Sequence, residues 1–232
     1  MHTRLLLLAA AMLLALPLPA ATLQDVKGAL HEFRGASPVS ITLVSSDQRT
    51  DGKEKGESHG TSVAEDDGAR IHLIHDKKDL AGQRQTKRGA DYSVGAAEAA
   101  EMLNFAPSLL KTLEGATVKR ITQTMRNGKS VTLLEINPPR QKDDDGDKWI
   151  KNYVDTLLLW VDNKGLPVAA ERTKQMKIRI VVVGFEVFEK DELQFEAVND
   201  HLVVTKRVTA SSGSGLGQGE SGVKSVVASI AR

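Results

Sequence analysis

The sequence predicts an α+β fold that is mostly β: a long, curved antiparallel sheet, an incomplete barrel, with an N-terminal helix and an inserted helical pair as its lid. Three observations indicate this class. Apolar residues recur with a period of two in several segments after residue 38, which is typical of half-buried strands. Turn dipeptides separate these segments at short intervals, so we expect hairpins rather than crossovers. Helix-favouring patterns fall in only two places, residues 22–35 and 94–114.

The first 21 residues have the order of a secretory signal peptide. A short start with one positive charge precedes the unbroken apolar run Leu5–Leu16, and prolines and small residues follow. The run is shorter than the ~20 residues that span a bilayer, which favours cleavage over a retained anchor. We therefore expect a cut after Ala20 or Ala21 and a periplasmic location. One mature domain, residues 22–232, should remain and should not span a membrane.

The composition narrows the possible classes of protein. Without cysteine, the chain has no disulfide, no thiol catalysis and no lipid-bearing residue of the bacterial lipoprotein type, so burial alone must hold its core together. The 31 basic and 30 acidic residues nearly balance, which gives no electrostatic footprint for nucleic acid. Aromatic residues make up only 4% of the chain, which argues against a base-stacking surface. We expect no nucleic-acid partner.

The two helical regions differ in whether a proline interrupts the helical pattern. In the first, Thr22–Gly35, the apolar residues fall on one helical face, and a strand with alternating apolar residues follows at Val39–Leu43. In the second, Pro107 interrupts the pattern, because proline removes a helical hydrogen bond and clashes with the preceding turn. We therefore predict two short helices there, Ala96–Asn104 and Pro107–Glu114.

The other segments predict strands joined by turns. Asn127-Gly128 supplies the positive φ angles of a tight hairpin. Tyr153–Val161 is the most apolar strand and is expected to be central and covered on both faces. The Gly/Ser-rich residues 211–222 predict a flexible segment, and Val223–Ile230 predicts a last strand at an edge of the sheet. The remaining predicted strands lie near Glu57–Val63, Ala69–His75, Thr117–Met125, Lys129–Ile136, Met176–Val182, Leu193–Ala197 and Leu202–Val208.

Motifs for chemistry are weak throughout the sequence. The four aspartates at 143, 144, 145 and 147 lack the glycine and glutamate of a calcium loop, so an exposed acidic turn is favoured. His72 and His75 alternate to opposite faces of a predicted strand and do not form a ligand pair. The glycines of 213–219 have no following lysine-serine pair, and no serine sits in a nucleophile elbow. We expect no metal, no cofactor and no enzyme.

Three stretches resemble the periplasmic lipoprotein-carrier superfamily, the LolA- and LolB-like proteins and the outer-membrane lipoprotein-sorting proteins. Residues 23–43 (LQDVKGALHEFRGASPVSITL) resemble the family's opening helix and first strand. Residues 105–113 (FAPSLLKTL) resemble its lid helix, and residues 158–170 (LLWVDNKGLPVAA) resemble its strand-turn-strand. The resemblance implies a half-barrel whose helices cover an apolar cavity for acyl chains.

The resulting expectation is a soluble carrier that shields an apolar ligand, either an acyl chain or a lipid-modified protein, without chemistry. The alternative is an envelope protein-interaction, sensor or assembly module with a filled core, since apolar cavities and apolar cores use the same residue types. The split at Pro107 favours the carrier, and the low aromatic content favours the module. The expected ligand-lining residues are Met102, Phe105, Leu109, Leu110, Leu113, Leu157, Leu159, Met176 and Ile178.

Overall fold

The computed structural model describes residues 20–51, 54–75, 94–140, 149–180, 183–215 and 218–231. The apolar run of the expected signal peptide and the acidic residues Asp143, Asp144, Asp145 and Asp147 lie outside the described residues. No helix within the described ranges is both long enough and apolar enough to cross a membrane.

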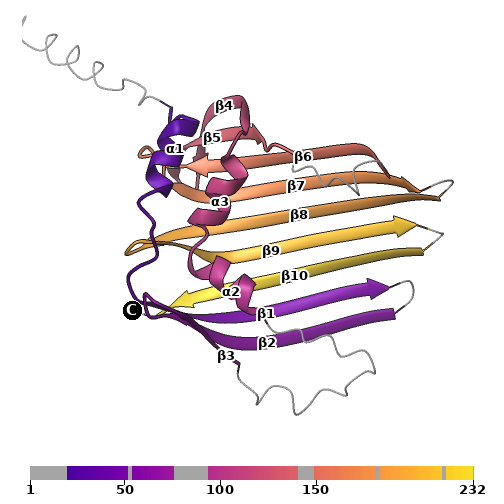
Figure 1. Cartoon of the computed structure of the whole chain (residues 1–232), viewed down its shortest axis with the longest axis horizontal. Helices are drawn as coiled ribbons and strands as arrows, with labels where there is room; N and C mark the ends of the chain where they lie inside the picture. The colour runs from indigo at the N-terminus through magenta and orange to yellow at the C-terminus, as the bar shows by residue number, and fades with distance from the viewer. Residues whose placement is uncertain are drawn as a thin grey trace, which may run out of the picture.

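The predicted fold class is confirmed: a single antiparallel sheet of ten strands stays open rather than closing into a barrel (Figure 1). Its order is β3-β2-β1-β10-β9-β8-β7-β6-β5-β4. The strands are β1 Val39–Asp51, β2 Glu54–Asp66, β3 Ile71–His75, β4 Thr117–Arg126, β5 Lys129–Asn137, β6 Ile150–Val161, β7 Pro167–Ile180, β8 Val183–Val198, β9 His201–Gly215 and β10 Gln218–Ile230.

The helices begin and end where local chemistry requires. In α1 (Leu23–Leu30), Thr22 and Asp25 form a capping box that satisfies the first free N–H groups. This helix ends well before Gly35, whose positive φ of 64° belongs to the loop that follows. The predicted pair is present as α2 (Ala96–Leu103) and α3 (Ala106–Leu113). Pro107 sits in the first turn of α3, where its missing N–H is harmless.

Backbone geometry confirms the predicted hairpin turn and defines two further turns. Asn127 and Gly128 join β4 to β5 with φ angles of 49° and 75°, as a tight hairpin requires. Asn199, between β8 and β9, also has a positive φ, of 53°. Gly165 has a φ of 81°, and a Cβ there would lie 2.9 Å from the backbone of Asp25. The turn between β6 and β7 therefore packs directly against α1.

One prediction about the C-terminal region is wrong, and the secondary structure of its Gly/Ser-rich segment is now defined. The last strand does not lie at an edge, because β10 pairs with both β1 and β9 and so joins the two ends of the chain inside the sheet. Most of the Gly/Ser-rich segment 211–222, which the sequence predicts to be flexible, lies in strands, since β9 runs to Gly215 and β10 starts at Gln218. Backbone pairing holds a strand whatever the side chains, so a small-residue composition does not by itself indicate a loop.

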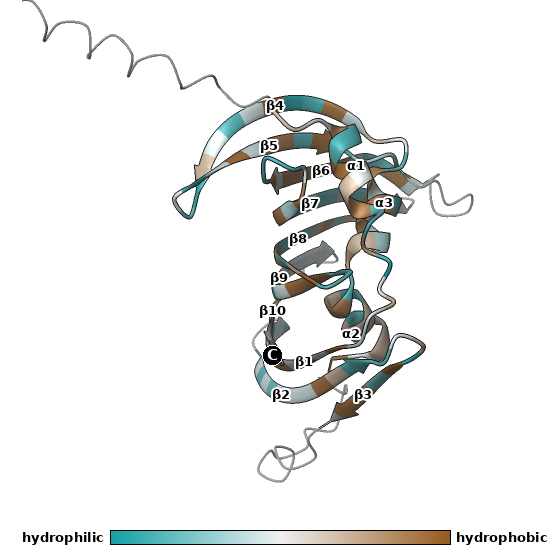
Figure 2. Ribbon diagram, turned by 90° about the vertical axis from the view of Figure 1, so that its left-hand side faces the viewer, coloured by the Kyte–Doolittle hydropathy of each residue, from teal (hydrophilic) through white to brown (hydrophobic). Residues whose placement is uncertain are grey.

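The core lies between the helices and one face of the sheet, which curves around them (Figure 2). The helices cross the strands near one end and leave the other end of the sheet bare on this face (Figure 1). Among the described residues, the most deeply buried large side chains on the sheet include Ile41, Leu43, Leu134, Ile136 and Leu159. The helices contribute Leu30, Met102, Leu103, Leu109 and Leu113. The sheet is therefore divided along its strands into a covered part and an open part.

Candidate functional site

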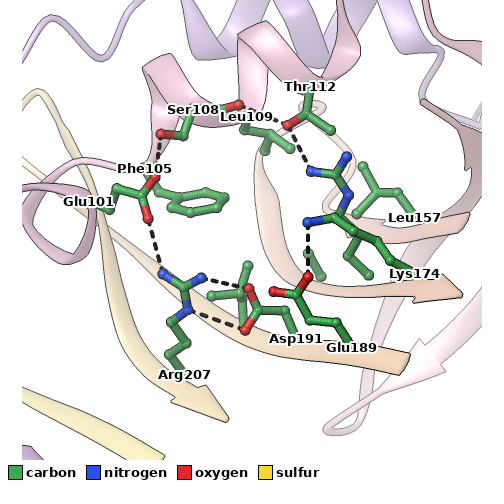
Figure 3. Close-up of a pocket in the computed structure, with 13 residues that line it drawn as sticks. Glu101, Phe105, Ser108, Leu109, Thr112, Leu157, Lys174, Glu189, Asp191 and Arg207 are labelled. Carbon is green, nitrogen blue, oxygen red and sulfur yellow. Dashed lines mark hydrogen bonds and ion pairs between the residues drawn. The ribbon is translucent and has the colours of Figure 1, made fainter. Parts of the chain in front are cut away.

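A cavity of about 190 Å³ opens beneath α3, between this helix and strands β6 to β9 (Figure 3). The helices contribute Glu101, Phe105, Ser108, Leu109 and Thr112, and the sheet contributes Leu157, Ala170, Arg172, Lys174, Glu189, Asp191, Leu193 and Arg207. The cavity lies where the covered part of the sheet gives way to the open part. One side of it is aliphatic and the other is charged.

The aliphatic side continues the core. Leu157, Ala170 and Leu193 point from adjacent strands toward the helical pair, and each is at most 5% exposed. Leu109 closes the space from above and is 2% exposed. Phe105, at the junction of α2 and α3, completes this side. Its ring centroid lies 5.5 Å from that of a buried phenylalanine on β8. An alkyl group that entered the cavity would meet hydrocarbon on this side.

The charged side begins with Arg172 on β7. Its guanidinium donates two hydrogen bonds to the carboxylate of Asp155 on β6, at 3.0 and 2.7 Å, and the side chain of Asp155 is only 2% exposed. A third bond, of 3.4 Å, reaches the hydroxyl of Thr112 on α3. Burial disfavours the charge of Arg172, yet its bonds to Asp155 outweigh this and raise its pKa above the ordinary value. The same carboxylate accepts a bond from Tyr153, whose pKa is raised by burial and by Asp155.

A second arginine, Arg207 on β9, ties the sheet to α2. It donates two hydrogen bonds to Asp191 on β8, at 3.2 and 2.6 Å, and a third of 3.0 Å to Glu101. Burial opposes its charge, but Asp191 and Glu101 together raise its pKa above the ordinary value. Glu101 in turn accepts a hydrogen bond of 2.9 Å from Ser108 on α3. One guanidinium therefore fixes both helices relative to two strands.

The third cation, Lys174, is held more loosely. It donates one hydrogen bond of 3.2 Å to Glu189, and the two side chains are 36% and 39% exposed. The pair lies two residues further along β7 and β8 than Arg172 and Asp191, and therefore on the same face. It forms the outer rim of the cavity, toward the open part of the sheet.

The charged residues Arg172, Lys174, Glu189, Asp191 and Arg207 form a band on this face of the sheet. This charged band extends across the sheet beyond the cavity. On β10, Lys224 forms an ion pair with Glu98 of α2. On β1, the neighbour of Lys224 across the strands is Asp47, a buried carboxylate that pairs with Arg49 at 2.9 Å. Ion pairs from β9 (Arg207) and β10 (Lys224) thus bind α2 directly, and they mark the line at which the helical cover ends.

The structure places the nine predicted lining residues in three settings. Phe105, Leu109 and Leu157 line the cavity. Met102, Leu113 and Leu159 are completely buried in the core, and Leu110 is partly buried against it. Met176 and Ile178 are half-buried on the open part of β7, beyond the charged band. The helical pair and the sheet thus meet at Leu109 and Leu157 but not at the far end of β7.

A second, shallower hollow of about 560 Å³ lies at the open end of the sheet, across β6 to β10, and most of the side chains around it, among them Gln175, Lys177 and Glu186, belong to the face opposite the helices. Met176 contributes to it, together with a serine- and glycine-rich stretch of β9 and β10. Polar residues, among them Asn152 and Gln175, make up much of its border, and it has no helix above it. It lacks the enclosed aliphatic wall of the cavity below α3.

Sequence reasoning missed the charged side of the cavity entirely. Arg172 and Lys174 stand two and four residues after Ala170, so the period-two pattern places them on the same face as Ala170 and Met176. Extending that alternation backward from Met176 would have found them. The histidines gave no site: His72 lies 3.4 Å from Asp67 on the surface, and no cluster of metal-ligating residues occurs within the described ranges.

No protein-family model matches this sequence, and no curated protein is significantly similar to it.

Proposed function

We propose that this chain is an exported carrier that binds an acyl chain, from a lipid or a lipid-modified protein, between α3 and the sheet. The observation that carries the proposal is the cavity of about 190 Å³, which has a continuous aliphatic wall of Leu109, Leu157, Ala170 and Leu193. Binding makes and breaks no bond, and its driving force is the removal of hydrocarbon from water. The signal-peptide pattern and the resemblance to periplasmic lipoprotein carriers support the same proposal.

The cavity is smaller than the 300–1,000 Å³ that is usual for small-molecule sites, so α3 must move to admit a long chain. Lifting α3 exposes Leu109 and Leu113, which together contribute roughly 3–6 kcal/mol of burial. Each methylene of the ligand that is buried contributes about 0.8 kcal/mol to the free energy of binding. Chains of fewer than about eight methylenes therefore do not offset the opening, whereas longer chains do.

The first test measures affinity against chain length. Saturated fatty acids of eight to sixteen carbons are titrated into the mature protein by calorimetry, each below its critical micelle concentration. We expect little binding at eight carbons and then about a fourfold gain in affinity per added methylene. A series without this dependence contradicts the proposal.

A second test fills the cavity. In Ala170→Leu the added carbons enter the space beneath α3, so the fold is retained while acyl-chain binding falls at least tenfold. Ala169→Leu is the matched control, because Ala169 is completely buried on the other face of β7 and is absent from the cavity wall. We expect that control to lower the free energy of unfolding by roughly 1–3 kcal/mol, through overpacking.

One observation favours a second candidate function, a protein-interaction module with a permanently closed core. The helices already bury their apolar faces, since Met102, Leu103 and Leu113 are fully inaccessible. This candidate predicts that solvent extraction of the protein purified from the cell envelope yields no lipid and that no fatty acid binds. The carrier predicts co-purified acyl chains, which mass spectrometry detects.

A further inference from the structure

We infer that the cavity beneath α3 selects an amphiphile whose head group carries both a negative and a positive charge, with the Lys174–Glu189 pair as its head-group site. This inference rests on the proposed carrier function and names the ligand class of the same cavity. It follows from the balance of charges around the cavity, from the contacts that each charge already makes, and from the position of the pair relative to the aliphatic wall.

The charges that line the cavity balance. Arg172, Lys174 and Arg207 supply three positive charges, and Glu101, Glu189 and Asp191 supply three negative ones. A site for a purely anionic head group would be expected to carry an excess of cations, and a site for a cationic one an excess of carboxylates. A balanced set of charges is complementary to a head group that itself carries both signs.

The two arginines already have ion-pair partners within the protein. Arg172 is held by two bonds to Asp155, and Arg207 by two bonds to Asp191 and one to a glutamate of α2. Displacing either guanidinium would leave a carboxylate with little access to water and no ion-pair partner, which is strongly unfavourable. A ligand therefore leaves both arginines where they are.

The Lys174–Glu189 pair at the rim can bind the head group of a ligand. The ammonium of Lys174 carries three donors, and its bond to Glu189 uses one of them. Both side chains are more than a third exposed, so they exchange partners at low cost. A zwitterion that enters between them gives Lys174 an anion and Glu189 a cation, and neither charge is left unpaired. An anion alone would leave Glu189 facing Asp191, its neighbour on the same face of β8.

The position of the pair matches the shape of an amphiphile. Along β7 the residues that face the helices run from Ala170, in the aliphatic wall, to Arg172 and then Lys174. A strand rises about 3.3 Å per residue, so Lys174, four residues after Ala170, lies roughly 13 Å from it, toward the open end of the sheet. A single acyl chain beneath α3 thus places its head group at Lys174 and Glu189, with solvent beyond. Figure 3 shows this pair opposite Leu109 and below α3.

The experiment compares amphiphiles that share one fourteen-carbon chain, measured by calorimetry below their critical micelle concentrations. They are myristoyl lysophosphatidylethanolamine, N-myristoyl-lysine, myristate and tetradecylamine. We expect each zwitterion to bind at least about tenfold more tightly than either singly charged compound, because it makes two charge-assisted contacts where they make one. The lysolipid and the acylated amino acid distinguish a phospholipid source from an acylated-peptide source, and preference for either supports the inference.

Variants of Lys174 and Glu189 test whether this pair causes the preference for zwitterionic amphiphiles. Lys174→Met should weaken the zwitterions and shift the preference toward tetradecylamine, while Glu189→Met should shift it toward myristate. The exchange of both, Lys174→Glu with Glu189→Lys, keeps the charges opposite and should retain the preference for zwitterions. The matched control is Lys177→Met with Glu186→Met, an ion pair of 2.7 Å between the same two strands on the opposite face, which should change nothing.

Two outcomes overturn the inference in distinguishable ways. Equal affinity for all four compounds, with the chain-length dependence intact, rejects the head-group site and leaves the carrier standing. Absence of binding by any of the four rejects the carrier, and the head-group site with it.

Discussion

The two parts of the sheet's helix-side face have the same backbone pairing and different environments. Beneath the helices, side chains such as Leu134 and Leu159 are wholly buried. Beyond the charged band, Val187 is 39% exposed, and β9 presents only Gly213 and Gly215 on that face. An α-helix with its side chains is about 10–12 Å wide, whereas a strand of 16 residues spans roughly 53 Å, so helices that cross the strands cover only part of them. The difference shows that helical cover, rather than β pairing, determines where this protein has a core.

The largest expected effect comes from removing a covered leucine. Leu159→Ala leaves a void beneath the helices and should lower the free energy of unfolding by about 3–5 kcal/mol. The corresponding truncation on the open part, Val187→Ala, should cost less than about 1 kcal/mol. Urea unfolding followed by circular dichroism measures both. Similar losses at the two positions would mean that the open part is covered in solution.

The next effect concerns the charged band. Arg172→Met leaves the carboxylate of Asp155, whose side chain is 2% exposed, without its ion-pair partner, and should destabilise by roughly 3 kcal/mol. Adding Asp155→Leu to this variant removes the unpaired charge and should recover most of the loss. If the double variant is no more stable than Arg172→Met alone, burial of the carboxylate is not the cause.

A smaller effect tests the order of the Gly/Ser-rich strands at the open end. A Cβ at Gly215 would lie 2.3 Å from the ring of Phe185, so Gly215→Ala should displace the ring and destabilise by about 1 kcal/mol. At Gly213 the nearest atom to such a Cβ is a backbone oxygen at 3.9 Å, so Gly213→Ala should be neutral or slightly stabilising. Equal effects would favour the flexible segment that the sequence predicted.

The smallest effect is a dependence on pH at the covered end. The carboxylate of Asp200 accepts backbone hydrogen bonds from Ala36 and Ser37, at 2.7 and 3.0 Å, and the bond from Ala36 is the main cause of its low pKa of about 2. Since this pKa lies below the ordinary value of 3.8, the stabilisation is present above pH 4 and is lost as the pH falls from about 4 to 2. Asp200→Asn should therefore have a flatter stability profile than the natural sequence between these pH values.

The sequence predicts the fold because local signals agree with one another. Alternation located the strands, Asn127-Gly128 located a hairpin, and Pro107 separated the two helices. The pairing of β10 with β1 was missed because it joins residues about 170 to 190 positions apart, which no local pattern encodes. An edge strand can be identified only when the order of the strands in the sheet is known.

The site is predictable only in part. Leu109 and Leu157 followed from the expectation that the helical pair faces the sheet, and both line the cavity. The charged wall did not follow, because charged residues that share a face with apolar ones look like solvent-exposed positions until the helix above them is placed. Arg207 illustrates this, since its partner Glu101 lies more than 100 residues earlier in the chain.

Hydrogen exchange of the helical pair tests the central claim most directly. If α2 and α3 open to admit an acyl chain, their amides exchange through an opening of lower free energy than that of β6 to β9, and a bound fourteen-carbon amphiphile slows them. The account predicts this protection for peptides that cover residues 96–113, with little change in β1 and β2. Exchange of these helices only by global unfolding, unaffected by any amphiphile, would contradict it.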